Sequence, residues 1–242
     1  MPAFSYSRLE SAPIRATIER LQDRIRERFP ESSLNGVAAE MANTAQQNEA
    51  VLEELRRPVW WLRISGFVAF LAIVCLAVWI VTSFVRMADE RHGTFGDLLQ
   101  AVDSAINEVI FLSLTIYFLI SLETRFKRRR ALRMLHRFRS LAHILDMHQL
   151  TKDPEYVLHD VETTASSPPR PLTRAELTRY LDYTSELLAL VSKLAALHAQ
   201  DLQDSVVLEA VNDVESLTAD LSRKVWQKIT ILNVTGSTQH PD

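Results

Sequence analysis

Histidine and carboxylate side chains gather in the second half of the sequence, and their types suit metal binding. His136, His143 and Asp146 are seven and three residues apart, which places them on one face of a helix, and His148 and His159 lie nearby. Imidazole and carboxylate groups are ligands for zinc or nickel. However, His136 and His143 would be separated by about 10.5 Å along a helix, so they cannot share one ion there. We therefore predict polar packing or helix-end hydrogen bonds and no metal site.

The motifs of the common enzyme classes are missing from the sequence. No His-Glu-x-x-His zinc motif occurs, and no serine stands in a Gly-x-Ser-x-Gly elbow. The only cysteine, Cys75, has no partner for an intramolecular disulfide or a thiolate metal site. The glycines form neither a phosphate-binding loop nor a dinucleotide-binding pattern; they are Gly36, Gly66, Gly93, Gly96 and Gly236. We predict a protein that is not an enzyme, with no catalytic residues and no cofactor.

A polar line runs through an otherwise apolar stretch. Ser113, Tyr117 and Ser121 are four residues apart and share one helix face, whereas Glu108 falls on the face of Thr115. Such residues commonly form hydrogen bonds between membrane helices. The alternative is that they line a pore. A continuous polar face that included Glu108 would favour the pore, and the sequence lacks one.

Eight cations occur within the fifteen residues from Arg125 to Arg139. Such a run holds the end of a membrane span on the cytoplasmic side, and it also attracts anionic lipid. We predict lipid-headgroup contacts for six of the eight: Arg125, Lys127, Arg128, Arg129, Arg130 and Arg133. Nucleic acid is not an expected partner, because the net charge is −3 and no groove-reading motif accompanies the cations.

The strongest apolar segment lies within residues 60–86, which we predict to be transmembrane helix 1. From Ile64 to Val85 there are 22 residues without a charge, enough to cross a hydrocarbon core of about 30 Å. Trp60 and Trp61 precede this segment, and amphipathic indole rings favour the membrane interface. A soluble core helix of this length and uniformity is not expected.

A second, shorter span is predicted at residues 108–122. Only the 14 residues from Val109 to Leu122 are free of charge, and extending the segment backwards includes Glu108. A carboxylate in hydrocarbon is costly. We therefore place Glu108 at the outer interface, with burial inside the bilayer as the alternative.

Charges around these segments predict the orientation. The connector at 87–107 and its flanks hold five acidic and two basic residues, whereas arginines and lysines crowd the other end of each span. Because basic residues mark the cytoplasmic side, both termini are predicted inside, with a short external loop at 87–107. That loop is too small for a folded external domain.

The N-terminal region and the segment after the second span are predicted to be helical and cytoplasmic. Residues 1–57 contain two apolar stripes of helical spacing, which are divided at Pro30. After residue 122 the helix is expected to continue without a break as a basic juxtamembrane helix at 123–153. Pro154 then disfavours helical backbone at Asp153, and a Pro/Ser linker follows at 154–172.

The C-terminal region at 173–233 is predicted to be amphipathic and coiled-coil-like, followed by a tail at 234–242. It begins with a capping box formed by Thr173 and Glu176. Its apolar stripe suits either one long helix or an antiparallel pair that turns between Gln200 and Ser205. The stripe requires a partner, which is the N-terminal helices, its own second half or another subunit.

Several segments resemble a family of bacterial two-transmembrane proteins with no assigned activity. The resemblance is carried by the stretch from Phe126 to Pro154, by Leu181–Leu187 with Lys193–Leu197, and by the tetrapeptide that begins at Trp226. It covers most of the chain after residue 50. It implies a bacterial inner membrane and no catalytic activity, and it draws attention to the segment from His143 to Pro154.

Together these features predict an all-α membrane protein, a two-span transmembrane hairpin with N-terminal and C-terminal cytoplasmic helices. Our leading hypothesis is a non-enzymatic anchor or scaffold that forms homo-oligomers or docks a cytoplasmic protein through these helices. Charged residues at Leu188 and Val191 are then expected to break assembly. The alternative is a homo-oligomeric channel or membrane-permeabilising effector of roughly four or more subunits, with Glu108 at its outer mouth.

Overall fold

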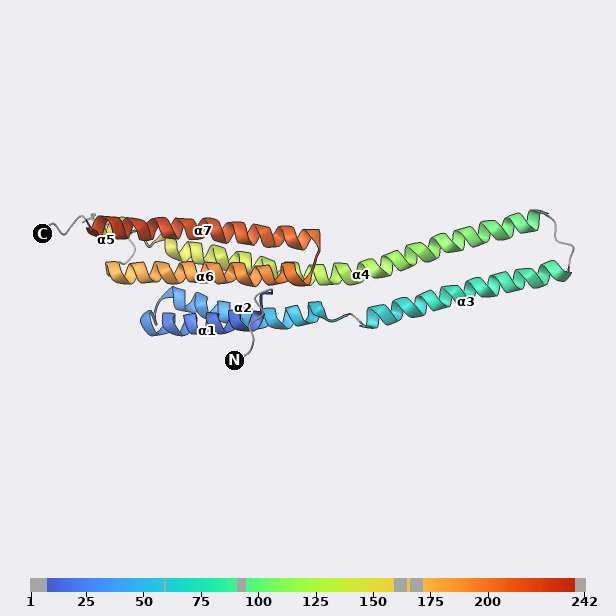
Figure 1. Cartoon of the computed structure of the whole chain (residues 1–242), viewed down its shortest axis with the longest axis horizontal. Helices are drawn as coiled ribbons and strands as arrows, with labels where there is room; N and C mark the ends of the chain where they lie inside the picture. The colour runs from blue at the N-terminus through green and yellow to red at the C-terminus, as the bar shows by residue number, and fades with distance from the viewer. Residues whose placement is uncertain (1–7, 59, 91–94, 159–164, 166–171, 238–242) are drawn as a thin grey trace. The chain divides into compact units, whose positions relative to one another are not determined.

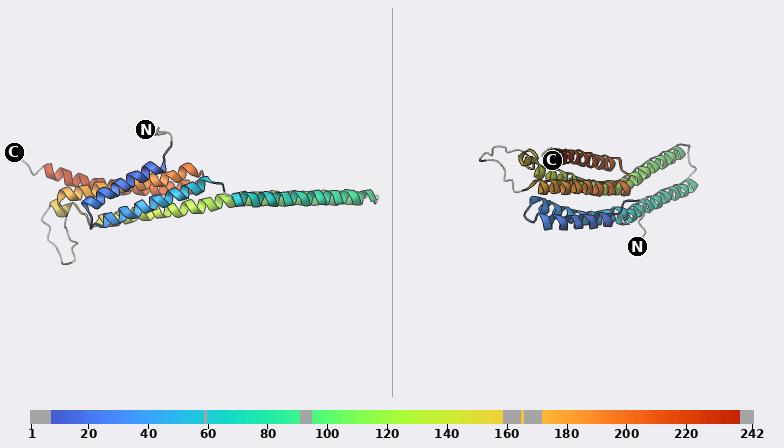
Figure 2. Two further views of the ribbon diagram at one scale, coloured as in Figure 1. Left: turned by 90° about the horizontal axis from the view of Figure 1, so that it is seen from below. Right: turned by 60° about the vertical axis from the view of Figure 1, so that its left-hand side comes forward.

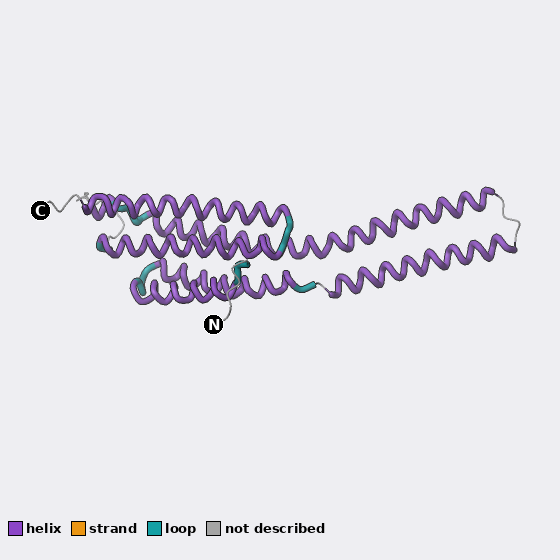
Figure 3. Tube along the Cα trace, viewed as in Figure 1, coloured by secondary structure: helices purple, strands orange, loops and turns teal. Residues whose placement is uncertain are grey.

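The chain is all-helical in the part that the computed structural model describes, namely residues 8–58, 60–90, 95–158, 165 and 172–237. No strand occurs in that part (Figure 3). The described residues form seven helices (Figure 1): α1 (Ser11–Arg28), α2 (Ser33–Arg56), α3 (Trp60–Glu90), α4 (Phe95–Leu150), α5 (Glu155–Leu158), α6 (Arg174–Asp201) and α7 (Ser205–Ser237).

The helices belong to two compact units. The first, which we call the bundle, comprises residues 1–56 and 130–242; it holds α1, α2, the end of α4, α5, α6 and α7. The second, which we call the apolar unit, comprises residues 57–129 and holds α3 and the first part of α4. Each unit has its own pattern of burial.

The first two helices form a hairpin at the place where Pro30 divides the sequence. The apolar stripe of α1 is fully buried at Ile18 and Ile25. After Phe29 the chain turns, and the Ser32 hydroxyl accepts the backbone N–H of Leu34 at 3.1 Å, which satisfies one free donor at the start of α2. The predicted pair of N-terminal helices is therefore confirmed.

The C-terminal region is a helical hairpin rather than one long helix. α6 ends at Asp201, and α7 begins at Ser205 beside it (Figures 1 and 2). The Asp204 carboxylate accepts the N–H groups of Val206 and Val207 at 3.1 and 3.3 Å, so it caps α7. At the other end, the predicted capping box of α6 is present. Hydrogen bonds from Thr173 lower the pKa of Glu176.

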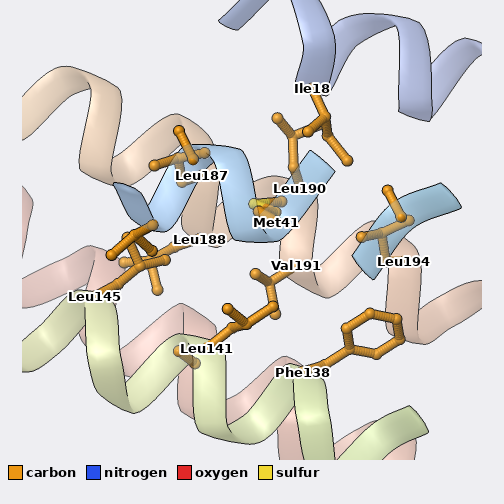
Figure 4. Close-up of a cluster of buried hydrophobic side chains, with 14 of the residues drawn as sticks. Ile18, Met41, Phe138, Leu141, Leu145, Leu187, Leu188, Leu190, Val191 and Leu194 are labelled. Carbon is orange, nitrogen blue, oxygen red and sulfur yellow. The ribbon is translucent and has the colours of Figure 1, made fainter. Parts of the chain in front are cut away.

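One apolar core joins the helices of the bundle, and it covers the stripe of α6. Figure 4 shows Phe138, Leu141 and Leu145 of α4 facing the α6 residues Leu188, Val191 and Leu194. All six side chains are at most 5% exposed. Helices α1 and α2 contribute Ile18 and Met41 to the same cluster. The partner that the stripe requires is thus found within the same chain.

This burial corrects the expectation that charges at Leu188 and Val191 would report on assembly. Both side chains are almost completely buried in the core of a single chain. A charge there would be desolvated without a counter-ion and would disrupt folding first. Loss of assembly in such a variant would therefore be a consequence of unfolding.

Helix α4 agrees with the prediction of a continuous helix through residues 108–150 and departs from it at both ends. It begins at Phe95, so most of the predicted loop at 87–107 is helical. The reason is that Leu99, Val102 and Ile106 recur at helical spacing without a proline. It ends at Leu150, three residues before the predicted stop, and the short helix α5 lies within the predicted linker.

The apolar unit exposes its hydrophobic side chains. Val109, Ile110 and Phe111 of α4 are 58–70% exposed, although consecutive residues point about 100° apart around the helix axis. Within the described residues, α4 contains one segment that is long and apolar enough to cross a bilayer, judged by length and composition. In α3 the corresponding described stretch, Ile64–Trp79, is apolar but shorter.

Truncation of Leu188 tests the core. We expect Leu188→Ala to lower the free energy of unfolding by about 2–5 kcal/mol, because the residue leaves a cavity among well-packed neighbours. Leu208→Ala is the control, since Leu208 is 43% exposed on α7. Guanidinium unfolding in uncharged detergent, followed by circular dichroism, measures both. Equal effects of the two substitutions would contradict the described core.

Candidate functional site

The predicted lipid-contact residues at the start of the basic segment differ in exposure and pairing. Arg125 and Arg129 are exposed. Lys127 forms an ion pair with Glu123 at 3.1 Å, and both side chains are largely covered. Arg128 is half-buried. The structure therefore leaves Arg125 and Arg129 as the accessible cations of this part of the run.

Three further arginines of the basic run line a groove between α2 and α4 in the bundle. The groove has a volume of about 440 Å³, and we call it the arginine groove; it is lined by Val51, Arg130, Arg133, Met134 and Arg137. Three and four residues separate the arginines, so all three lie on one side of α4. The sequence prediction named Arg130 and Arg133 but missed Arg137.

Two polar contacts join α2 to α4 across the arginine groove. Arg130 forms an ion pair with Glu54 at 2.6 Å, and Arg137 donates a hydrogen bond to the side-chain oxygen of Gln47. Moving from Gln47 to Glu54 along α2, the partner on α4 moves backwards from Arg137 to Arg130, so the two helices run antiparallel. Arg133 lies between the contacts in sequence and has no carboxylate partner among the described residues.

The polar line of the apolar unit lies on α4, as its spacing predicted. The Ser113 hydroxyl donates to the carbonyl of Val109 at 2.8 Å, and the Ser121 hydroxyl donates to the carbonyl of Phe118 at 2.7 Å. Tyr117 is 73% exposed, and Glu108 is half-buried. Because both serine donors are satisfied within their own helix, they need no partner from another helix.

The histidines considered for metal binding are not brought together. His136 and His143 are exposed on α4, while Asp146 accepts a hydrogen bond from the side chain of Gln149 at 2.8 Å. His159 lies outside the described residues. Among the residues that are described, no group of three or more His, Cys, Asp or Glu side chains is arranged to hold a metal ion.

A buried polar pair that no sequence pattern connects lies in the bundle core. His198 Nε2 and Asn48 Oδ1 are 2.7 Å apart, and both residues are fully buried. The Phe138 ring lies 6.1 Å from the His198 ring, centroid to centroid. Burial lowers the pKa of His198 to about 4, although the nearby Asp201 carboxylate acts in the opposite direction. His198 is therefore neutral near pH 7.

The Asp201 carboxylate, at the end of α6, links that helix to Arg8 and to the end of α2. It accepts hydrogen bonds from Arg8 and, at 2.9 Å, from Arg56 Nε. The Asp201 side chain is only 2% exposed. A carboxylate at a helix C-terminus opposes the helix dipole, and the two guanidinium groups offset that cost. This contact positions Arg56, the last residue of α2.

The end of α4 is held by α7. Lys228 Nζ donates a hydrogen bond to the backbone carbonyl of Gln149 at 2.8 Å, which satisfies a carbonyl in the last turn of α4. Burial lowers the pKa of Lys228, while Asp153 and Asp146 act in the opposite direction. Together with the contacts to α2, this bond sets the position of the arginine-bearing face of α4.

Comparisons with known proteins give no relative of this chain. No family model, no curated protein and no solved structure matches it. The resemblance to bacterial two-transmembrane proteins therefore stays a prediction from the sequence.

Acid should destabilise the bundle through His198. Its pKa is about 4 in the folded state, whereas an unfolded chain keeps a value near 6.5. Between these values the unfolded state binds a proton that the folded state does not. The free energy of unfolding should therefore fall as the pH drops from 6.5 to 4, by up to about 3 kcal/mol.

The variant His198→Gln measures this contribution, since an amide retains a donor for Asn48 but does not titrate. Chemical unfolding at several pH values should show a shallower decline for this variant than for the natural chain. His143→Gln, which changes an exposed histidine, should leave the decline unchanged. The same slope for all three proteins would show that His198 is not the titrating group.

Proposed function

We propose that this chain is a two-span protein of the bacterial inner membrane that anchors its helical bundle at the cytoplasmic face as a non-enzymatic scaffold. The observation that carries the proposal is the contrast between the two units. The bundle buries its large apolar side chains, whereas α3 and the first part of α4 expose theirs in many directions. Such surface on a soluble monomer would be unusual, and lipid would cover it.

The lengths and flanks of α3 and α4 support two spans. α3 has 31 residues, which corresponds to about 46 Å, and a bilayer core of about 30 Å requires roughly 20 residues. Trp60 and Trp61 are 67% and 68% exposed at the start of α3, as expected for interfacial side chains. The excess of basic residues before α3 and after residue 124 supports cytoplasmic termini.

The scaffold role rests on the sequence and on the surface of the bundle. The sequence contains none of the phosphate-loop, zinc or nucleophile motifs considered above. Trp226 on α7 is 56% exposed, and a large aromatic side chain on a bundle surface is typical of protein interfaces. The apolar stripe of α6 is buried within the chain, so it is not available for self-association. We therefore propose that a second copy of the chain covers Trp226 instead.

Labelling of single cysteines tests the membrane topology. In a Cys75→Ser background, Gly96→Cys should react with a membrane-impermeant maleimide in intact spheroplasts. Gln46→Cys and Ser205→Cys, on exposed positions of α2 and α7, should react only after lysis. The Gly96 position tolerates the change, because an added Cβ would meet no atom within 4 Å.

Each labelling outcome bears on a separate part of the topology. Labelling of Ser205→Cys or Gln46→Cys in intact spheroplasts would contradict cytoplasmic termini. Protection of Gly96→Cys before lysis would contradict an external connection between the spans. A maleimide reaction on denatured protein serves as the control for cysteine reactivity.

Self-association should depend on Trp226. We expect a dimer or larger species in uncharged detergent, and we expect Trp226→Glu to shift it toward the monomer while helicity is retained. Light scattering with the detergent contribution subtracted measures the protein mass. The neighbouring change Gln227→Glu adds the same charge at an exposed position and should leave the mass unchanged. A monomeric natural chain would contradict self-association and leave the anchor role in place.

A further inference from the structure

The bundle has a second basic groove, and its charges are largely compensated. It lies between α1 and α6, has a volume of about 570 Å³, and is lined by Arg24, Glu27, Arg28, Arg179 and Tyr183. Arg24 pairs with Glu186 at 3.2 Å, and Arg179 lies 3.6 Å from Asp182. Each of these two guanidinium groups therefore already has a carboxylate partner. This groove offers little net attraction to a further anion.

The arginine groove between α2 and α4 is different, because two of its three charges are uncompensated. Arg130 is neutralised by Glu54, but Arg137 contacts only the neutral amide of Gln47. Arg133 is exposed and has no carboxylate partner in the described part of the chain. The groove thus carries a net charge close to +2, formed by two guanidinium groups one helical turn apart on one face.

The geometry suits a compact, multiply charged anion. From Arg130 to Arg137 the groove extends about 10.5 Å along α4, which is long enough for one or two phosphate groups. A guanidinium group presents parallel N–H donors that match the oxygens of a phosphate. The two ends of the groove are held by the contacts to Glu54 and Gln47, so that the arginine-bearing face is positioned before a ligand arrives.

The apolar residues of the groove indicate the nature of the rest of the ligand. Val51 on α2 and Met134 on α4 complete the lining. Neither side chain can form the hydrogen bonds that would select a sugar or a nucleic-acid base. They suit an apolar part of the ligand next to its anionic group.

We propose that the arginine groove binds a phosphate group, with Arg133 and Arg137 as its principal ligands. The phosphate belongs either to the headgroup of an anionic lipid or to a soluble phosphoryl compound, and both present the same chemistry to the arginines. This site goes beyond the anchor role. It is independent of membrane insertion, because every lining residue belongs to the bundle.

Binding to the full chain in uncharged detergent tests the site with two probes. Isothermal titration with inorganic pyrophosphate measures a soluble source, and native mass spectrometry with phosphatidic acid measures a lipid source. We expect saturable binding of at least one probe. The double variant Arg133→Gln/Arg137→Gln should weaken that binding by about tenfold or more, since it removes two charge-assisted contacts.

The matched control removes the same charge from the same bundle. Arg20→Gln/Arg139→Gln alters two exposed arginines that do not line the groove and are not among the predicted lipid contacts, and it should weaken binding by less than about threefold. Binding of phosphatidic acid alone would assign the site to a lipid headgroup, and binding of pyrophosphate alone would assign it to a soluble compound. Equal losses in the two double variants, or no saturable binding of either probe, would overturn the proposal.

A second variant keeps every arginine and neutralises part of the groove. Gln47→Glu replaces the amide that contacts Arg137 with a carboxylate of nearly the same shape, at an exposed position of α2. Phosphate binding should fall by about tenfold or more while the helical content and thermal unfolding stay close to those of the natural chain. A Gln47→Glu protein that is folded and binds as tightly as the natural chain would show that the phosphate binds elsewhere.

Discussion

Both units of this chain are shaped by the tendency of apolar side chains to avoid water. In the bundle, the stripes of α1, α2, α4, α6 and α7 close on one another, and residues such as Phe138 and Val191 are fully buried. In the apolar unit the same kinds of side chain remain exposed, with Phe111 at 70%. The bundle therefore buries its apolar side chains within the chain, whereas the two helices of the apolar unit require lipid or protein to cover theirs. The proposed anchor role is the simplest way to satisfy both.

Polar contacts then decide where the helices of the bundle stop and which faces they present. Asp201 draws Arg8 and Arg56 to the end of α6, and Lys228 binds the last turn of α4. These contacts, together with the ion pair between Arg130 and Glu54, hold α4 in a position where the arginines of the arginine groove lie beside α2. The proposed phosphate site is therefore a by-product of packing, since α4 must bury its apolar side and its basic side is left along the edge of α2.

Sequence features that act over a few residues predicted where the helices lie. Contacts between residues far apart in the sequence could not be predicted. The break at Pro30, the capping box at Thr173 and the continuous helix after residue 122 depend on neighbours within a few residues. The choice between one long C-terminal helix and a hairpin could not be made, because the same stripe suits both. His198 and Asn48 are 150 residues apart, so no periodicity could connect them. Arg137 was missed for the same reason, since its role depends on Gln47 of another helix.

Alkaline carbonate extraction of membranes from cells that produce the full chain measures whether the apolar unit is embedded in lipid. Carbonate strips proteins that are held at a membrane by charge alone, including those held by a basic segment such as that from Arg125 to Arg139. We expect the chain to stay in the membrane pellet and to be released only by detergent. Quantitative release of the chain into the carbonate supernatant would show that the apolar unit does not span the bilayer.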